Sequence, residues 1–265
     1  MKLFNQPQYA LAMKNNLCSF TAYINDIPAF NNRQGTAYNL SVPINHLIKH
    51  GENSFKVQVT PLKPSTYLQE LSECFAIILV KDLFDNADEF IEISITGFPT
   101  GTSNDTLKLP AFEIKGKFDA TLPFVDYLWV NATKLDQNRS TLIDLARRYF
   151  HAFHEALIKK DTNHLFHEIA LREKEFSMAF YDDYDEGFAK TQKDFMDTLN
   201  DENYRLQELD LVHFIPRFYA DDRIITFENE KSEQPIFFIN EVEHTRRQYP
   251  LFLCMNEKNK MLLIR

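Results

Sequence analysis

The sequence predicts a mixed α+β protein, with an antiparallel β-sandwich in its N-terminal half and an α+β domain in its C-terminal half. Two observations carry this prediction. Short β-rich runs recur through the first half, and a helical period replaces them after the polar stretch KLDQNRS at residues 134–140. The 265 residues are enough for two domains that each bury a core. We therefore expect one domain at residues 1–133 and a second at 134–265.

Seven β-rich runs divide residues 17–133. They are CSFTAYI (18–24), NLSVPI (39–44), SFKVQV (54–59), CFAIILV (74–80), FIEISI (90–95), LKLPAFEI (107–114) and FVDYLWV (124–130). Segments such as NDIPAFNN and TGFPTGTSND, and a helical turn in NHLIKHGEN, separate them. Runs of this length and spacing are typical of a β-sandwich.

The passage from Asn39 to Val59, NLSVPINHLIKHGENSFKVQV, resembles the leader, short turn, G-x-N and strand of β-sandwich accessory domains. Such domains occur beside carbohydrate-active and cell-surface proteins, so the resemblance implies an accessory role. The residues also have a purely structural explanation. Gly51 can adopt the positive φ that ends the turn, and Asn53 can satisfy backbone groups before the next strand begins.

A helical pattern begins after the polar stretch, in STLIDLARRYFHAFHEALIKK. Its apolar residues recur at Leu142, Ala146, Tyr149, Phe153 and Leu157, which predicts an amphipathic helix capped by Ser140 or Thr141. A second helical pattern follows a break at residues 161–163, and a third spans about 188–199. The runs LDLVHFI, RIITFE, PIFFIN, PLFLCM and MLLIR then predict strands, which gives an α+β half.

The passage ARRYFHAFHEALIKKDTNHLFHEIA resembles the opening of NTF2-like domains, in which a first helix ends near a Lys/Gly-Asp pair and a second starts soon after. The resemblance implies that the later strands form a curved antiparallel sheet. This sequence departs from the family in having no clear hairpin between its second and third helices. The family includes small-molecule isomerases, cyclases, binding modules and bacterial immunity-type proteins, so it leaves the function open.

Four of the eight histidines lie in HAFHEALIKKDTNHLFHE, where the pattern H-x-x-H-E occurs twice. The two sets are His151, His154 and Glu155, and His164, His167 and Glu168. At about 100° per residue, they project away from the apolar stripe of each helix. The H-E-x-x-H and E-x-x-H spacings of zinc and di-iron sites are missing. We therefore predict a solvent-facing surface and no bound metal.

Other sequence signals of chemistry are also missing. The six glycines form no phosphate-binding loop, and G-x-S-x-G does not occur. Cys18, Cys74 and Cys254 are far apart in sequence and set in apolar runs, which predicts buried free thiols and a reducing compartment. We expect no cofactor and identify no catalytic residue, which favours a protein that is not an enzyme.

The composition is acidic, with 29 basic and 38 acidic side chains and a formal net charge of -9. This balance disfavours nucleic acid and favours a partner with a basic surface. The sequence contains no apolar window of about 18 residues, so we expect no membrane-spanning helix. The N-terminal residues lack the apolar core of a secretion signal, so we expect a cytoplasmic protein, or a periplasmic one if a signal was removed.

An acidic and aromatic segment, YDDYDEG at residues 181–187, follows the second helical pattern. It fails the calcium-loop spacing, because Gly187 comes too early and no Glu occupies the twelfth loop position. A solvated loop is one interpretation. The other is a partner-binding edge formed by Tyr181, Asp182, Asp183, Tyr184, Asp185 and Glu186, because tyrosines supply contact area and carboxylates steer a basic partner.

Three functions therefore stay open. The acidic balance and the missing catalytic motifs favour a non-catalytic bacterial immunity protein that neutralises a cognate toxin or effector. The second is an NTF2-like small-molecule-binding protein or enzyme, with Tyr149, His213 and Tyr219 near its cavity. The third is a carbohydrate-binding or cell-envelope accessory protein, which only the N-terminal sandwich suggests.

Overall fold

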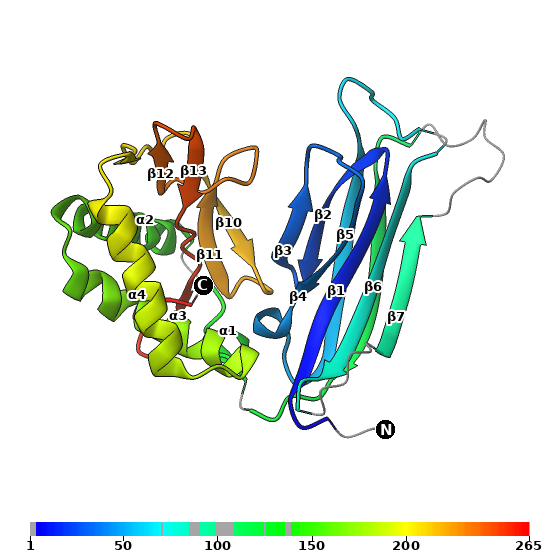
Figure 1. Ribbon diagram of the computed structural model, residues 1–265, viewed down its shortest axis with the longest axis horizontal. Helices are drawn as coiled ribbons and strands as arrows, with labels where there is room; N and C mark the ends of the chain where they lie inside the picture. Colours follow the sequence, from blue (N-terminus) through cyan, green and yellow to red (C-terminus); the bar gives the residue numbers. More distant parts are fainter. Residues whose placement is uncertain are drawn as a thin grey trace. The chain divides into compact units, whose positions relative to one another are not determined.

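A computed structural model describes residues 4–69, 71–84, 91–98, 109–124, 126–135 and 139–264. The chain forms two compact units, Met1–Asp126 and Tyr127–Arg265 (Figure 1). Helices and antiparallel sheets both contribute, so the predicted α+β class is confirmed at that level. Among the described residues, no helix is both long and apolar enough to cross a membrane.

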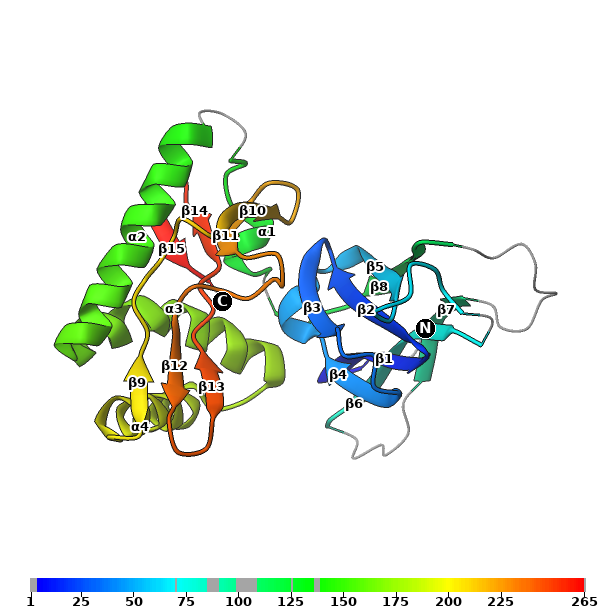
Figure 2. The same ribbon diagram turned by 90° about the horizontal axis from the view of Figure 1, so that it is seen from above.

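The first unit contains two four-stranded antiparallel sheets (Figure 2). One has the order β4-β1-β6-β7, formed by β1 (Pro7–Asn16), β4 (Tyr38–Pro43), β6 (Glu73–Asp82) and β7 (Ile91–Phe98). The other has the order β3-β2-β5-β8, formed by β2 (Cys18–Ile24), β3 (Ile27–Asn32), β5 (Gly51–Pro61) and β8 (Phe112–Ala120). The predicted helical turn is the 3₁₀ helix η1 (Asn45–Leu47).

Side chains of both sheets meet in a shared core. Along β5, Phe55, Val57 and Val59 are buried and alternate with more exposed residues, as a half-buried strand requires. The Phe118 ring on β8 lies 6.4 Å from that of Phe55 and 6.3 Å from that of Tyr9 on β1. These contacts join strands of the two sheets through aromatic packing.

The turn before β5 has the predicted chemistry. Gly51 has a φ of +85°, which favours glycine. The Asn53 side chain accepts a hydrogen bond from the Lys49 amide and donates to the carbonyls of Lys49 and Gly51, each at 2.8 Å. The structural explanation of the G-x-N motif is therefore confirmed.

Several strand predictions for the first unit need correction. The strands β1 and β3 were not predicted, since both carry a proline and mixed polar residues. The run at 124–130 is not a strand, because its last residues start the short helix α1 (Leu128–Asn131). A short apolar run without a clear period does not distinguish the two states. The predicted residues 90, 99–108, 125 and 136–138 lie outside the described part of the chain.

The second unit builds one core from helices and two antiparallel sheets (Figure 2). Its long helices are α2 (Arg139–Lys159), α3 (Thr162–Phe180) and α4 (Tyr184–Asn200). One sheet has the order β10-β11-β14-β15, with β10 (Ile215–Tyr219), β11 (Ile224–Glu228), β14 (Leu253–Met255) and β15 (Met261–Leu263). The other has the order β13-β12-β9, with β9 (Tyr204–Leu206), β12 (Phe237–Asn240) and β13 (Thr245–Gln248).

Local sequence explains the three long helices. The predicted amphipathic pattern of α2 is confirmed, although Phe150 is fully buried and the predicted core residue Tyr149 only half-buried. Helix α3 begins at the N-cap Asp161, whose side chain accepts a hydrogen bond from the His164 amide at 3.1 Å. The predicted caps of α2 are wrong, because Ser140 and Thr141 lie inside its first turn.

The strand predictions for the second unit are mostly right. Four of the predicted runs contain strands, namely RIITFE (β11), PIFFIN (β12), PLFLCM (β14) and MLLIR (β15). The strand predicted for LDLVHFI is wrong, because β10 starts only at the last residue of that run, Ile215. The strands β9 and β13, which the sequence did not predict, are short and polar. Strand β10 contains a proline, which is tolerated because β10 is the edge strand of its sheet.

The boundary between the units lies between Asp126 and Tyr127, rather than between residues 133 and 134. The side chains of Tyr127 and Trp129 are buried, and the Leu128 amide donates to Glu175 Oε1 on α3 at 2.6 Å. The Thr133 amide donates to the Met255 carbonyl at 3.0 Å. Burial raises the pKa of Glu175 to about 7, and the Leu128 hydrogen bond opposes this rise.

We predict that a fragment starting at Tyr127 is more stable than one starting at Lys134. The shorter fragment loses the burial of Tyr127 and Trp129, which should lower the free energy of unfolding by at least about 3 kcal/mol. Urea denaturation followed by circular dichroism measures both. Equal unfolding midpoints would contradict the assignment of residues 127–133 to the second unit.

Candidate functional site

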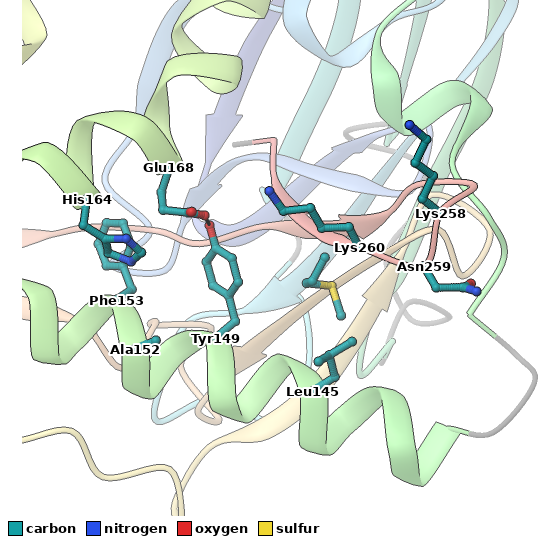
Figure 3. A pocket seen from close by; sticks show the side chains of 10 residues that line it. Leu145, Tyr149, Ala152, Phe153, His164, Glu168, Lys258, Asn259 and Lys260 are labelled. Carbon is teal, nitrogen blue, oxygen red and sulfur yellow. Dashed lines mark hydrogen bonds between the residues drawn. The ribbon is translucent and has the colours of Figure 1, made fainter.

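A pocket of about 460 Å³ lies in the second unit, between α2, α3 and the turn that joins β14 to β15 (Figure 3). This volume falls in the range of sites that hold small organic molecules. The lining residues are Leu145, Tyr149, Ala152, Phe153, His164, Glu168, Lys258, Asn259, Lys260 and Met261. Apolar side chains and a few polar groups are therefore combined, as in many ligand sites.

Helical spacing places the pocket residues of α2 and α3. Leu145, Tyr149, Ala152 and Phe153 recur at intervals of three or four residues, so they share one side of α2. His164 and Glu168 are separated by one turn of α3. The face of α2 that carries Phe150 is directed into the core. The helix thus presents one apolar face to the core and an adjoining face to the pocket.

Tyr149 and Glu168 form the polar centre of the pocket. The Tyr149 hydroxyl donates a hydrogen bond to Glu168 Oε2, which joins α2 to α3. Burial raises the pKa of Tyr149, and the hydrogen bond and negative charge of Glu168 raise it further. The hydroxyl therefore stays protonated at neutral pH and orients the carboxylate. Figure 3 shows the two side chains directed toward each other.

A polar network continues from this pair to α4. Arg172, one turn after Glu168, lies close enough to Tyr149 for its charge to oppose the rise in the tyrosine pKa. Its guanidinium Nη2 lies 2.6 Å from Glu173 Oε1, and both side chains are only 14% exposed. The Thr191 hydroxyl on α4 donates to Glu173 Oε2 at 2.8 Å. These contacts fix α3 between its two neighbouring helices.

The opposite wall of the pocket is basic. Lys258 and Lys260 belong to a turn in which Asn256 Oδ1 accepts hydrogen bonds from their amides at 3.0 and 2.9 Å. Asn259, between them, has a φ of +57°. Neither ammonium group has a salt-bridge partner within the described part of the chain. Figure 3 shows the Lys260 side chain extending toward Tyr149 and Glu168.

A second hollow, of about 720 Å³, lies near the C-terminal ends of α2 and α4. Charged residues of both signs line much of it, including Lys160, Glu202, Arg205 and Glu241. Arg205 and Glu241 already form a salt bridge of 3.6 Å. Because its charges are mixed and partly paired, this hollow defines a ligand less well than the smaller pocket does.

The histidine prediction is partly wrong. His154 is buried, and its Nε2 lies 2.8 Å from the Gln207 carbonyl oxygen, because the chain after β9 covers that side of α2. Glu168 is half-buried rather than solvent-facing. The side chains of His151, Glu155, His164 and His167 are exposed, as predicted. Among the described residues, no three metal-binding side chains come together.

The segment at residues 181–186 is the corner between α3 and α4. Tyr181, with a φ of +61°, ends α3, and Asp183 caps α4 by accepting from the Glu186 amide at 2.9 Å. Tyr184 stacks on Phe188 with 5.4 Å between ring centroids. The four acids (Asp182, Asp183, Asp185 and Glu186) are exposed, whereas both tyrosines are half-buried. We call these six residues the acidic corner.

Only Tyr149 of the three predicted cavity residues lines the pocket. His213 is exposed and contacts Asp210, and Tyr219 donates to Glu228 Oε2 at 2.9 Å. Sequence reasoning missed Glu168, Lys258 and Lys260 as pocket residues. The separation of His164 and Glu168 by one helical turn could have indicated that they share a face of the helix. Nothing in the sequence indicated that the distant turn NEKNK, at residues 256–260, lies beside that face.

Comparisons of the chain with protein-family models, with curated proteins and with solved structures find no match. The chemistry of the pocket itself is therefore the best indication of function. The resemblances of the two halves to accessory domains and to NTF2-like domains stay predictions.

We predict that Tyr149→Phe lowers the free energy of unfolding by about 1–2 kcal/mol, because the half-buried Glu168 carboxylate loses its donor. The double variant with Glu168→Met should be less destabilised than the sum of the single variants, by about 1 kcal/mol. Urea denaturation of all four proteins measures this coupling.

The matched control for this cycle is Tyr184→Phe, whose ring stacks on Phe188 and whose hydroxyl has no described hydrogen bond. Its stability should change by less than about 0.5 kcal/mol. Strict additivity of the Tyr149 and Glu168 variants would show that the two side chains do not interact in solution.

Proposed function

We propose that the second unit binds a small organic molecule with an apolar body and an anionic group. The observation that carries this proposal is the arrangement of the pocket. An apolar surface lies between a carboxylate held by a tyrosine on one side and two lysines without described salt bridges on the other. A ligand that spans the pocket would satisfy both the apolar surface and the lysines.

Each part of the pocket selects a different part of the ligand. Leu145, Ala152 and the ring of Tyr149 offer the accessible apolar surface on which an apolar body displaces water, at about 25 cal/mol per Å² buried. Lys258 and Lys260 attract the anionic group. Glu168 repels an anion and accepts a hydrogen bond, so it fixes the direction in which the ligand lies. The pocket therefore favours one orientation of an amphipathic acid.

The same chemistry suits Tyr149 to orient a ligand rather than to act as a base. Tyr149 holds its proton firmly, because burial and the neighbouring carboxylate both raise its pKa. A general base at neutral pH needs a pKa near the working pH. The Tyr149 hydroxyl is therefore suited to hold Glu168 in a fixed orientation toward a ligand.

Both sequence resemblances are consistent with this proposal. Residues 146–170, which carry the NTF2-like resemblance, form most of α2 and the first half of α3, and these helices line the pocket. We infer an NTF2-like ligand-binding domain, since that family includes small-molecule-binding modules. The two antiparallel sheets of the first unit support its interpretation as a β-sandwich accessory domain.

We predict that aryl-alkanoic and medium-chain carboxylic acids bind the full chain more tightly than their neutral amides. Loss of one partly exposed charge contact of about 1 kcal/mol corresponds to roughly fivefold in affinity. Lys260→Met, which keeps the aliphatic stem, should therefore weaken binding of the acids about fivefold and leave the amides unchanged. Isothermal titration calorimetry measures both.

Two further variants complete this test. Ala152→Phe fills the pocket from an exposed helical position and should abolish binding of acids and amides alike. Lys190→Met removes an exposed lysine from α4, away from the pocket, and should change nothing. Equal affinity for acids and amides, or unchanged binding by Ala152→Phe, would contradict the proposed site.

The acidic corner supports a second candidate function, a non-catalytic immunity-type protein that neutralises a basic toxin or effector. The favouring observation is the exposure of four carboxylates around one turn between two helices. Such charges steer a basic partner and raise the rate of association. Tyr181 and Tyr184 are half-buried, so they offer less contact area than a free loop would provide.

We predict that replacing the four acids of the corner by Asn or Gln lowers the association rate with a basic partner and the salt dependence of that rate. Asn at position 183 still caps α4, so the fold is kept. Surface plasmon resonance against the product of an adjacent toxin gene measures both. Unchanged kinetics would remove the corner from the interface.

A further inference from the structure

Two cysteines that are distant in sequence lie close together in the first unit. Cys18 is the first residue of β2, and Cys74 follows the first residue of β6, so they belong to different sheets. Both residues have 0% exposure, and Cys18 Sγ donates to the carbonyl oxygen of Glu73, the residue before Cys74, at 3.1 Å.

The backbone around the two thiols is held by further contacts between the same segments. The chain passes from β1 to β2 through Leu17 alone, which has a φ of +50°. The Ser72 hydroxyl donates to the Leu17 carbonyl oxygen at 2.9 Å, and Asn15 is paired with Cys74 across β1 and β6. The segments that carry the two cysteines are therefore fixed beside each other by groups other than the thiols.

We propose that Cys18 and Cys74 form a reversible disulfide when a peroxide oxidises the protein, which gives the first unit a redox-dependent cross-link between its two sheets. Because Cys18 Sγ already contacts the carbonyl oxygen of the residue before Cys74, only a local movement is needed to reach the S–S bond length of about 2.05 Å. Cys254, the other cysteine of the chain, lies in β14 of the second unit and takes no part.

The reaction proceeds in two balanced steps. The Cys18 thiolate attacks one oxygen of hydrogen peroxide, which breaks the O–O bond, forms a sulfenic acid on Cys18 and releases hydroxide. The Cys74 sulfur then attacks the Cys18 sulfur and displaces hydroxide as the S–S bond forms. Each cysteine loses one electron, the peroxide gains two, and the two thiol protons end in the two water molecules released.

The two sulfurs have different roles in this reaction. Donation from Cys74 to Cys18 lowers the pKa of the Cys18 thiol, whereas the same hydrogen bond, followed by burial, raises the pKa of Cys74. Cys18 is therefore the thiol that ionises first and attacks the oxidant. Burial, with the charge of Glu175 adding to it, raises the pKa of Cys254 to about 12, so that thiol is the matched unreactive control.

The test uses the full chain, reduced, freed of reductant and treated with hydrogen peroxide. The protein is then unfolded in the presence of N-ethylmaleimide, which alkylates free thiols, and its intact mass is measured by mass spectrometry. We expect alkylation to fall from three cysteines to one, with a disulfide-linked peptide pair containing Cys18 and Cys74. Dithiothreitol should restore three alkylated cysteines. The oxidised protein should melt about 5 °C or more above the reduced one, because the cross-link closes a long loop.

Three variants define the outcome. Cys254→Ser should still lose both remaining thiols, whereas Cys18→Ser and Cys74→Ser should each keep both. Because the pair is buried, the treatment is repeated in urea below the unfolding transition, where local opening admits the oxidant. Three free thiols under both conditions, oxygen adducts without a disulfide, or a disulfide formed only after global unfolding would each overturn the proposal.

Discussion

The burial of one face of α2 determines how the second unit is built. Phe150 and Phe153 are buried, and the Phe150 ring makes an edge contact with Phe227 of β11 at 5.2 Å between centroids. Replacing a buried phenylalanine by alanine lowers the free energy of unfolding by about 3–5 kcal/mol. A rotation of α2 that took Phe150 out of the core would therefore be strongly unfavourable. Tyr149, adjacent to Phe150, is consequently held at the edge of the core with its hydroxyl on Glu168. The position of the pocket thus follows from the packing of the core.

Polar contacts then set the spacing of the helices that the core has oriented. The Tyr149 hydrogen bond joins α2 to α3, and Glu173 joins α3 to α4 through Thr191. Half-buried groups of this kind are costly to leave without partners, so they favour one arrangement over others that would bury the same apolar area. The lysines of the β14–β15 turn have no comparable partner among the described residues. The pocket thus combines an acidic group that already has a hydrogen-bond partner with lysines that can still bind an anion, and this distinguishes it from an ordinary surface hollow.

Local patterns in the sequence predicted the elements better than the contacts between them. The stripe of α2 follows from its apolar period, and the turn at Gly51 and Asn53 follows from backbone chemistry. Helix α1 could not be predicted, because the Leu128 amide is satisfied by Glu175 from a distant helix. The burial of His154 depends on a carbonyl beyond β9, and the pocket needs a turn near the C-terminus beside α2. The closeness of Cys18 to the segment that carries Cys74 likewise depends on how two sheets meet. In each case the deciding partner lies far away in sequence.

Crystallographic screening of the full chain with matched acidic, neutral and basic fragments shows whether the pocket selects an anionic ligand. We expect acidic aryl fragments to occupy the pocket with their rings against Leu145 and Ala152 and their anionic groups at Lys258 or Lys260, while Tyr149 still donates to Glu168. Acidic fragments that bind only elsewhere, or a pocket filled equally by neutral and basic fragments, would contradict this expectation.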